Sequence, residues 1–216
     1  MPPLETKERI LDAAEALFGR HGVDATSLRL ITTEADVNLA AVNYHFQSKD
    51  SLVAAVFERR VVPINLRRME LLDVLEARGE GTPLPIEEIL HAMTAPLLES
   101  ADLDRFGPMM ARMLLAEPPQ NMRSVIRNSL LPVVTRFTRL AHRALPHLTL
   151  QELAIRLHFS FGAILHTLTA AYSPLEEFDL QAPPRNPRQA LPQLIAYVAA
   201  GLRAPSLRAR ARKEPS

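Results

Sequence analysis

The stretch VNLAAVNYHFQSKDSL, residues 37–52, decides how the N-terminal part of the chain folds. Asn38 is a favoured N-cap residue, so residues 39–46 are expected to form a helix of about two turns. Val42 and Phe46 are four residues apart and hold one side of this helix against the protein, with Val37 just before it. The remaining side presents small and polar residues, namely Ala40, Ala41, Asn43, Tyr44 and His45.

The preceding residues predict two further short helices. Apolar residues at three- and four-residue spacing, from Leu4 through Phe18, are typical of an amphipathic helix that Gly22 closes. Thr26 or Ser27 then caps a second helix, whose inward residues are Leu28, Ile31 and Ala35. A three-residue turn, 36–38, leads into the quoted helix. Two helices joined in this way and braced by a third form a helix-turn-helix.

The rest of the chain is also predicted to be helical. Ser48 caps a long helix that Pro63 should kink or break near Arg60, and that resumes to Arg78. Residues 79–85 form a loop, and further helices are expected at about 86–100, 102–116, 120–145, 149–173 and 187–203. We therefore expect an all-α protein with a helix-turn-helix domain at 1–52, a helical bundle at 53–204 and a basic, disordered tail at 205–216.

Composition excludes several classes of protein. The 216 residues include no cysteine, which rules out disulfides and thiol catalysis. The N-terminus lacks the apolar core of a signal peptide, and no apolar run approaches the roughly 18 residues of a membrane span. We expect a cytoplasmic protein that does not enter a membrane. Residues 1–60 hold seven basic and nine acidic side chains, so binding to nucleic acid has to rest on geometry rather than on charge.

The helix at 39–46 has the chemistry of a DNA-reading element. The major groove is about 12 Å wide, and small residues let a helix backbone approach the bases while polar side chains bond to base edges. Arg29 and Lys49 are placed to contact phosphates, as are the amides at the helix starts near Thr26 and Asn38. The predicted DNA-binding residues are Thr26, Ser27, Arg29, Asn38, Leu39, Ala40, Ala41, Asn43, Tyr44, His45 and Lys49.

Residues 10–52 resemble the N-terminal domain of the TetR family of transcriptional regulators. The matching residues are Ala13, Ala14, Phe18, Gly22, Thr26, Ser27, Ile31, Ala35, Val37, Tyr44, His45, Phe46, Lys49 and Leu52. The strings TSLRLIT and VNLAAVNYHF resemble more narrowly the PsrA-type subgroup, which represses fatty-acid degradation genes and responds to long-chain fatty acids or their CoA thioesters. Two positions depart from the family: Asp36 replaces the usual glycine of the turn, and Asn43-Tyr44-His45 replaces a common Tyr-His-Tyr.

The resemblance implies a homodimer that binds a palindromic operator and encloses an apolar effector pocket in its C-terminal helices. Methionines adapt to irregular apolar ligands, although each is also ordinary core filler. The candidate pocket residues are Phe106, Met109, Met110, Arg112, Met113, His158, Phe159, Phe161, Gly162, Leu165 and His166. The candidate dimer residues lie on one face of the last helix and are Leu191, Leu194, Ile195, Val198 and Leu202.

Enzymatic and metal-dependent functions have no support in the sequence. His158 and His166 are eight residues apart on a helix, roughly 12 Å, which is too far to share one ion. There is no glycine-rich phosphate loop and no nucleophile elbow. We expect no enzyme activity, no metal and no cofactor. Two alternatives to a fatty-acid-responsive repressor remain open: an efflux-type regulator that responds to drugs or other hydrophobes, and a hydrophobe carrier without DNA binding.

Overall fold

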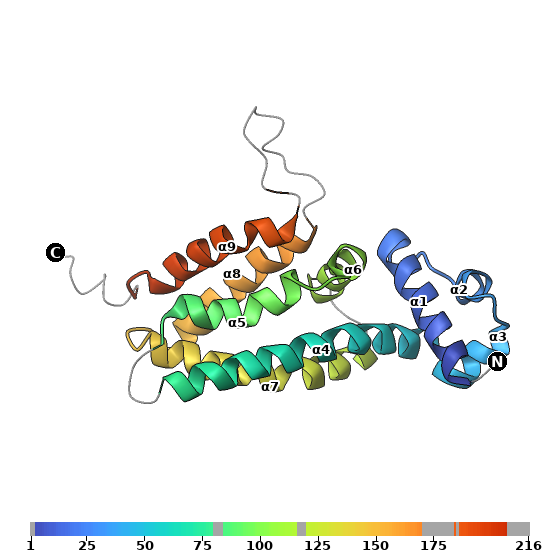
Figure 1. The fold of residues 1–216 in the computed structure, drawn as a ribbon, viewed down its shortest axis with the longest axis horizontal. Coiled ribbons are helices and arrows are strands. Elements are labelled where there is room, and N and C mark those ends of the chain that lie inside the picture. The colour runs from blue at the N-terminus through green and yellow to red at the C-terminus, as the bar shows by residue number, and fades with distance from the viewer. Residues whose placement is uncertain (1–2, 80–83, 116–119, 170–183, 185, 207–216) are drawn as a thin grey trace, which may run out of the picture. The chain divides into compact units, whose positions relative to one another are not determined.

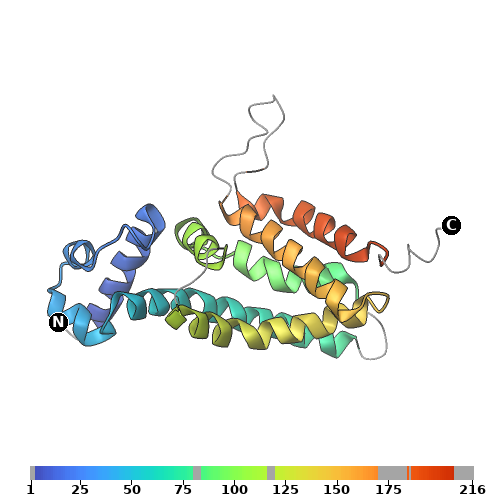
Figure 2. The same cartoon turned by 180° about the vertical axis from the view of Figure 1, so that it is seen from behind.

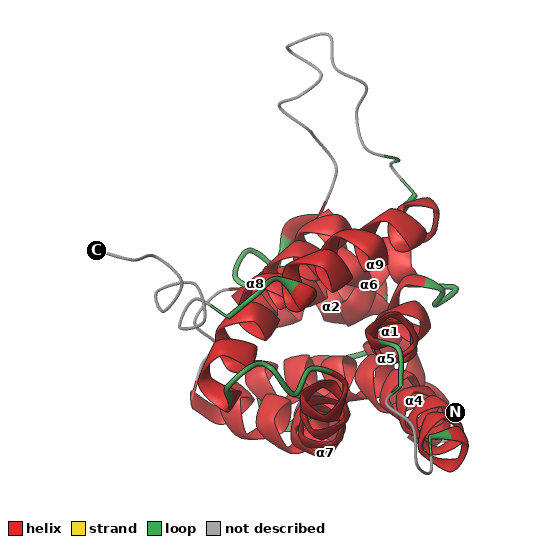
Figure 3. Ribbon diagram, turned by 90° about the vertical axis from the view of Figure 1, so that its left-hand side faces the viewer, coloured by secondary structure: helices red, strands yellow, loops and turns green. Residues whose placement is uncertain are grey.

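A computed structural model describes residues 3–79, 84–115, 120–169, 184 and 186–206 of the chain. Every regular element within these residues is a helix, which confirms the predicted all-α class (Figure 3). The described helices are α1 (Pro3–His21), α2 (Leu28–Glu34), α3 (Leu39–Phe46), α4 (Lys49–Arg78), α5 (Ile86–Leu98), α6 (Leu103–Leu115), α7 (Gln120–Ala144), α8 (Leu150–Thr169) and α9 (Pro187–Arg203). The predicted end of the 149–173 helix and the tail after residue 206 lie outside the described residues.

The chain forms two compact units, each built from two separate stretches. Unit 1 contains residues 1–65 and 101–130, and unit 2 contains residues 66–100 and 131–216. One part of α4 and one part of α7 therefore belong to each unit. The division does not follow the predicted limit at residue 52, because α6 packs against α1 and so joins the N-terminal helices.

The three N-terminal helices of unit 1 pack around a shared apolar core (Figure 1). Ile10 and Phe18 of α1, Ile31 of α2 and Val42 of α3 are all fully buried. α1 ends where Gly22 takes a φ of 82° and donates its N–H to the Phe18 carbonyl at 3.0 Å. The predicted left-handed glycine is thus confirmed, since a residue with a Cβ is strained at this angle.

The turn between α2 and α3 also follows the prediction. Ala35 ends α2, and Asp36 takes a φ of 48° in the left-handed region, which Asp tolerates better than most residues. The Asn38 side chain then accepts a hydrogen bond from the Ala41 N–H at 2.9 Å and so caps α3. Gln47 also has a positive φ, 62°, which no feature of the sequence predicts.

α4 runs without interruption from Lys49 to Arg78, although Pro63 lies inside it. The sequence predicts a kink or a break near Pro63, and the helix does not break there. A proline removes one hydrogen bond from the helix, but here the buried residues Val61, Ile64 and Asn65 surround it and hold the turn in place. The Asn65 side chain adds a hydrogen bond to the Ser129 carbonyl of α7 at 2.6 Å.

The core of unit 2 collects side chains from the second half of α4, α5, α7, α8 and α9. α9 packs against both α5 and α8, and Figure 2 shows α8 (orange) and α9 (red) side by side. Fully buried members of this core include Leu72, Ile89, Leu140, Leu153 and Leu202. Among the described residues, no helix combines the length and the hydropathy that a membrane crossing requires.

Candidate nucleic-acid interface

α3 has one buried side and one exposed side. Val42 and Phe46 are buried and anchor the helix, while Tyr44 is 79% exposed. Leu39, Ala40 and Asn43 are exposed beside it, and Ala41 and His45 are half-buried. A short helix thus presents small, amide and phenol side chains to solvent in the way that reading of a groove requires.

The helix before it, α2, places two predicted contact residues at its exposed start. The Ser27 hydroxyl accepts a hydrogen bond from the Leu30 N–H at 3.1 Å, so Ser27 rather than Thr26 is the N-cap. Arg29 is exposed in the first turn. An exposed cation beside a helix N-terminus favours an anion such as a phosphate.

Thr26 was predicted to contact DNA, and the structure contradicts this for its side chain. The residue is fully buried, and its hydroxyl donates to the Gly22 carbonyl at 2.7 Å and to the Leu17 carbonyl at 3.4 Å. The hydroxyl therefore ties the start of α2 to the end of α1. A Thr–Ser pair at a helix start does not reveal which of the two side chains turns inward.

Lys49 begins α4 and is half-buried. Its ammonium group donates to the Asp24 carbonyl at 3.4 Å, a long hydrogen bond. An ammonium has three donors, so this contact leaves Lys49 able to bind a phosphate oxygen as well. Ser48 precedes it and accepts from the Ser51 N–H at 3.1 Å, which confirms Ser48 as the predicted cap of α4.

Arg9 of α1 stabilises the turn before α3, and sequence reasoning missed it. Its guanidinium donates to the Ala35 carbonyl at 2.5 Å and to the Asp36 carbonyl at 3.1 Å. It also pairs with the Asp36 carboxylate at 3.1 Å. The acid that replaces the family's usual glycine is thus held by a cation, which reduces its repulsion of phosphates. The two residues lie 27 positions apart, so no local pattern predicts the pair.

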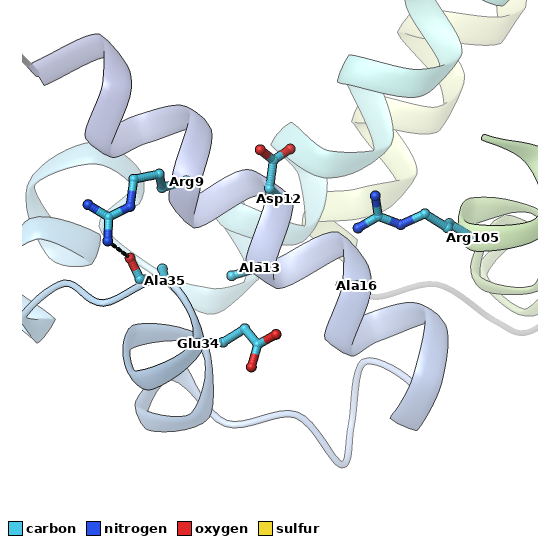
Figure 4. A pocket seen from close by; sticks show the side chains of 7 residues that line it. All are labelled: Arg9, Asp12, Ala13, Ala16, Glu34, Ala35 and Arg105. Carbon is cyan, nitrogen blue, oxygen red and sulfur yellow. Dashed lines mark hydrogen bonds between the residues drawn. The ribbon is translucent and has the colours of Figure 1, made fainter. Parts of the chain in front are cut away.

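A surface groove runs along α1 between the end of α2 and the start of α6 (Figure 4). Ala13 and Ala16 form its floor, and Arg9, Asp12, Glu34 and Arg105 contribute charged side chains. Two acids and two bases line the groove together, so it has no clear preference for an anion or a cation.

Arg60 of α4 joins three helices within unit 1. Its guanidinium donates from Nε to Glu15 Oε2 of α1 at 2.8 Å and pairs with Asp102, just before α6, at 2.5 Å. It also lies 5.8 Å from the centre of the Phe106 ring, a cation–π distance. Burial lowers the Arg60 pKa, but the hydrogen bonds and negative charges of Glu15 and Asp102 have the larger effect, so the Arg60 pKa is raised. Glu15 is only 1% exposed, so this ion pair is structural.

Gly19 lets α1 and α6 touch through their backbones. A Cβ built on Gly19 would lie 2.6 Å from the Arg105 carbonyl oxygen, a distance that side chains do not show. About two turns further along α6, Arg112 Nη1 would lie 3.5 Å from a Cβ on Gly22, just after the end of α1. A cation placed there is favoured by the helix macrodipole. At Gly19, α6 therefore contacts α1 without an intervening side chain.

The predicted pocket residues fall into two groups. On α6, in unit 1, Phe106, Met109 and Met110 are buried, Met113 is half-buried and Arg112 is exposed. Of the predicted pocket residues on α8, in unit 2, only Leu165 is buried. Gly162 is half-buried, and the α8 residues on the surface are His158, Phe159, Phe161 and His166.

Phe159 was predicted to line the effector pocket, and its side chain is 68% exposed in the single chain. α8 therefore carries large apolar side chains on a side that the single chain leaves open. Arg156 of α8 donates hydrogen bonds to the Leu202, Ala204 and Pro205 carbonyls and so caps the end of α9.

The face of α9 predicted to form a dimer lies in the core of its own unit. Leu191, Val198 and Leu202 are buried, and Leu194 and Ile195 pack against the core cluster. The prediction that this face is available to a partner is therefore wrong, because an apolar stripe on a helix identifies a buried side without saying what buries it.

The described residues contain no group of three or more side chains that could hold a metal ion.

Two parts of the chain match known domain families. Residues 10–56 match the N-terminal domain of the bacterial regulatory proteins of the tetR family, and residues 91–201 match the tetracyclin repressor-like C-terminal domain. The second match alone spans about half of the chain.

Individual proteins similar in sequence to this chain are also named as transcriptional regulators. The chain is 30% identical over 186 residues to the transcriptional regulator SrpR of Pseudomonas putida, which covers 82% of this chain and 79% of SrpR. It is 33% identical to the regulator AcrR of Shigella flexneri over 97 residues, which covers 44% of this chain and 43% of AcrR.

Among solved structures, SmeT, the repressor of the Stenotrophomonas maltophilia multidrug efflux pump SmeDEF, superposes with a TM-score of 0.55 at 26% identity, covering 89% of this chain and 91% of SmeT. The related proteins are transcriptional regulators rather than enzymes, and several are named as repressors. The chain belongs to the TetR family of bacterial transcriptional regulators.

Proposed function

We propose that this regulator is a ligand-responsive repressor that binds a palindromic operator as a homodimer in the cytoplasm. The observation that carries the proposal is the exposed face of α3, on which Asn43 and Tyr44 stand beside Ala40 while Val42 and Phe46 hold the helix from behind. Side chains of this kind bond to base edges, and alanine lets the backbone approach them.

The charges of unit 1 support this use of α3. Several of the acids that outnumber the bases at residues 1–60 are engaged by arginines of the same unit. Arg59 pairs with Asp12 at 2.6 Å and Arg20 pairs with Glu34 at 3.2 Å, and Asp36 and Glu15 are paired as described above. Arg29 and Lys49 flank α3 and supply the proposed phosphate contacts. The proposed DNA binding therefore depends on where these cations lie and not on a net positive charge of the domain.

The proposed dimer uses the exposed side of α8 and α9. Ile155, Phe159 and Tyr197 are exposed there, at 49%, 68% and 70%. A Cβ built on Gly162 or on Gly201 would meet no atom within 4 Å, so another helix has room to approach both positions closely. A second copy covers the exposed aromatic side chains, and its own α3 reads a second half-site about one helical turn away.

A hydrophobic effector, such as a long-chain fatty acid or acyl-CoA, is proposed to release the operator. The PsrA-like sequence around α3 supports this ligand, while the likeness to SmeT favours a second candidate, a regulator of drug efflux. In either case the effector binds better to a state in which the two α3 helices no longer fit the operator. Gly19 and Arg60 hold α6 to α1, so a shift of α6 moves the helix-turn-helix with it.

The test is fluorescence anisotropy of the purified protein on DNA from upstream of its own gene. Specific binding is expected with a Kd of about 10⁻⁸ M or tighter. Addition of palmitoyl-CoA should weaken this binding roughly 5- to 150-fold. Binding that palmitoyl-CoA leaves unchanged would discard the fatty-acid effector and favour the efflux-type regulator. No specific binding would contradict the proposed function.

A further inference from the structure

A surface pocket lies where the start of α1, the end of α3 and the first two turns of α4 meet, within unit 1. α1 packs against α3, and the start of α1 lies beside α3 in both Figure 1 and Figure 2. The residues that line this α1–α3–α4 pocket are Lys7, His45, Phe46, Gln47, Ser51 and Ala55. Of these, the sequence predicted a DNA contact only for His45.

The α1–α3–α4 pocket has a charge that suits an anion. Its described lining contains one cation, three neutral polar side chains that can donate hydrogen bonds, and no acid. The groove along α1 combines two acids with two bases. A third hollow, beside the turn from α2 to α3, is lined by Asp36 and by no base among the described residues. The α1–α3–α4 pocket thus differs from both in presenting a base without an acid.

Lys7 also differs from most basic residues near it. The arginines of α1 and α4 within residues 3–65 each pair with an acid, and these are Arg9, Arg20, Arg59 and Arg60. Lys7 is exposed, and its ammonium group has no partner within the part of the chain that the structure describes. Arg29 and Lys49 likewise pair with no described acid, and both are proposed phosphate contacts. Lys7 therefore belongs with the cations that the fold does not use to neutralise its own acids.

The backbone beside Lys7 is strained. Gln47 joins α3 to α4 with a φ of 62°, a conformation that costs free energy in a residue with a Cβ. Strained residues of this kind are frequent at binding sites, where the geometry that they impose is used. Here the turn keeps Gln47 exposed in the lining of the pocket and lets α4 begin two residues later, at Lys49.

We propose that the α1–α3–α4 pocket binds one phosphate of the DNA backbone, with Lys7 as its cation and Gln47 and Ser51 beside it. This inference rests on the proposed function and adds a contact from α1, a helix for which the sequence predicted only a bracing role. A lysine suits a phosphate because its compact charge carries three donors on a flexible stem. The amides near Asn38 serve the start of α3, so a phosphate bound at its other end fixes the register of α3 in the groove.

The test combines replacement of single phosphates in the DNA with three variants of the full-length protein. In duplexes of the upstream DNA, an uncharged methylphosphonate replaces one phosphate at a time, and fluorescence anisotropy measures the affinity. K7Q removes the cation but keeps a residue that favours a helix, and K7R keeps the charge. R127Q is the matched control, since it removes one positive charge from the exposed surface of α7 in the same unit.

K7Q should weaken binding to the unmodified upstream DNA roughly 2- to 30-fold at fixed salt, because the contact is lost in both copies of the proposed dimer. Replacement of one particular phosphate in each half-site should weaken binding of the wild-type protein, K7R and R127Q, but not of K7Q. Thermal unfolding of K7Q should match that of the wild-type protein, since the side chain is exposed. An unchanged affinity of K7Q, or a K7Q response that equals the wild-type response at every phosphate, would overturn the proposal.

The same measurements separate this inference from the proposed function. A wild-type protein that binds its upstream DNA, but with no phosphate contact that depends on Lys7, would overturn the pocket alone. Equal binding to upstream DNA and to a duplex of random sequence, with an affinity that K7Q lowers and R127Q does not, would contradict the repressor function and retain the pocket. Binding to neither duplex would overturn both.

Discussion

α3 and α9 have the same general pattern, an apolar stripe opposite an exposed face, but they differ in what the exposed face carries. On α3 the exposed residues include Asn43 and Tyr44, and the helix start is capped by Asn38. On α9 they include Ala196 and Ala200, which have no polar side-chain group, and the aromatic ring of Tyr197. The stripe of each helix packs inside its own unit. The exposed faces are the basis for the two proposed partners, DNA for α3 and a second subunit for α9.

The largest difference in unfolding free energy is expected between two variants that each remove one phenylalanine, Phe46→Ala in unit 1 and Phe159→Ala in unit 2. Phe46→Ala deletes a buried anchor of α3 and should cost about 3–5 kcal/mol of unfolding free energy, whatever the protein concentration. Phe159→Ala removes an exposed side chain, so its effect should appear only through the dimer and depend on protein concentration. Urea unfolding at two protein concentrations measures both. A concentration-independent loss at Phe159 would refute the proposed dimer face.

The ion pair that ties α1 to α4 should come next. Glu15→Gln leaves the Arg60 guanidinium without its buried partner and should cost about 3 kcal/mol of stability. The control is Arg67→Met, which breaks an exposed pair with Glu70 and should change stability by less than about 0.5 kcal/mol. Thermal unfolding of both variants gives the comparison. Equal shifts would mean that the pair at Glu15 is no more than a surface contact.

A smaller loss of stability is expected from changing Thr26, at the start of α2. Thr26→Val removes a buried hydroxyl and leaves the Gly22 carbonyl without that donor, at a cost of about 1–3 kcal/mol in stability. Its effect on the salt dependence of operator binding should be nil. Urea unfolding and anisotropy at several salt concentrations measure the two quantities. A flatter salt slope for Thr26→Val would restore the original prediction that Thr26 contacts phosphate.

The smallest effect is expected at Lys49. Lys49→Ala should leave stability nearly unchanged, weaken binding to all DNA sequences alike and reduce the salt slope by about one unit. Arg143→Ala, exposed on α7 in unit 2, is the matched loss of one positive charge. A slope that changes equally in both variants would show an effect of net charge and remove Lys49 from the proposed contacts.

Features set by neighbouring residues could be predicted from the sequence, and features set by distant ones could not. The left-handed Gly22, the caps at Asn38 and Ser48 and the helical class all depend on local rules. The pair of Arg9 with Asp36 joins residues 27 positions apart, and the link from Arg60 to Glu15 joins residues 45 apart. The continuity of α4 through Pro63 and the burial of the α9 stripe depend on packing, which no local pattern records.

The central claim, that the exposed face of α3 reads DNA, is tested most directly by operator affinity. Asn43→Ala and Tyr44→Ala should each weaken specific binding roughly 5- to 150-fold at fixed salt, with stability unchanged because both side chains are exposed. Asn128→Ala, exposed on α7, is the control and should bind as tightly as the wild-type protein. Operator affinity that neither α3 variant changes would contradict the account.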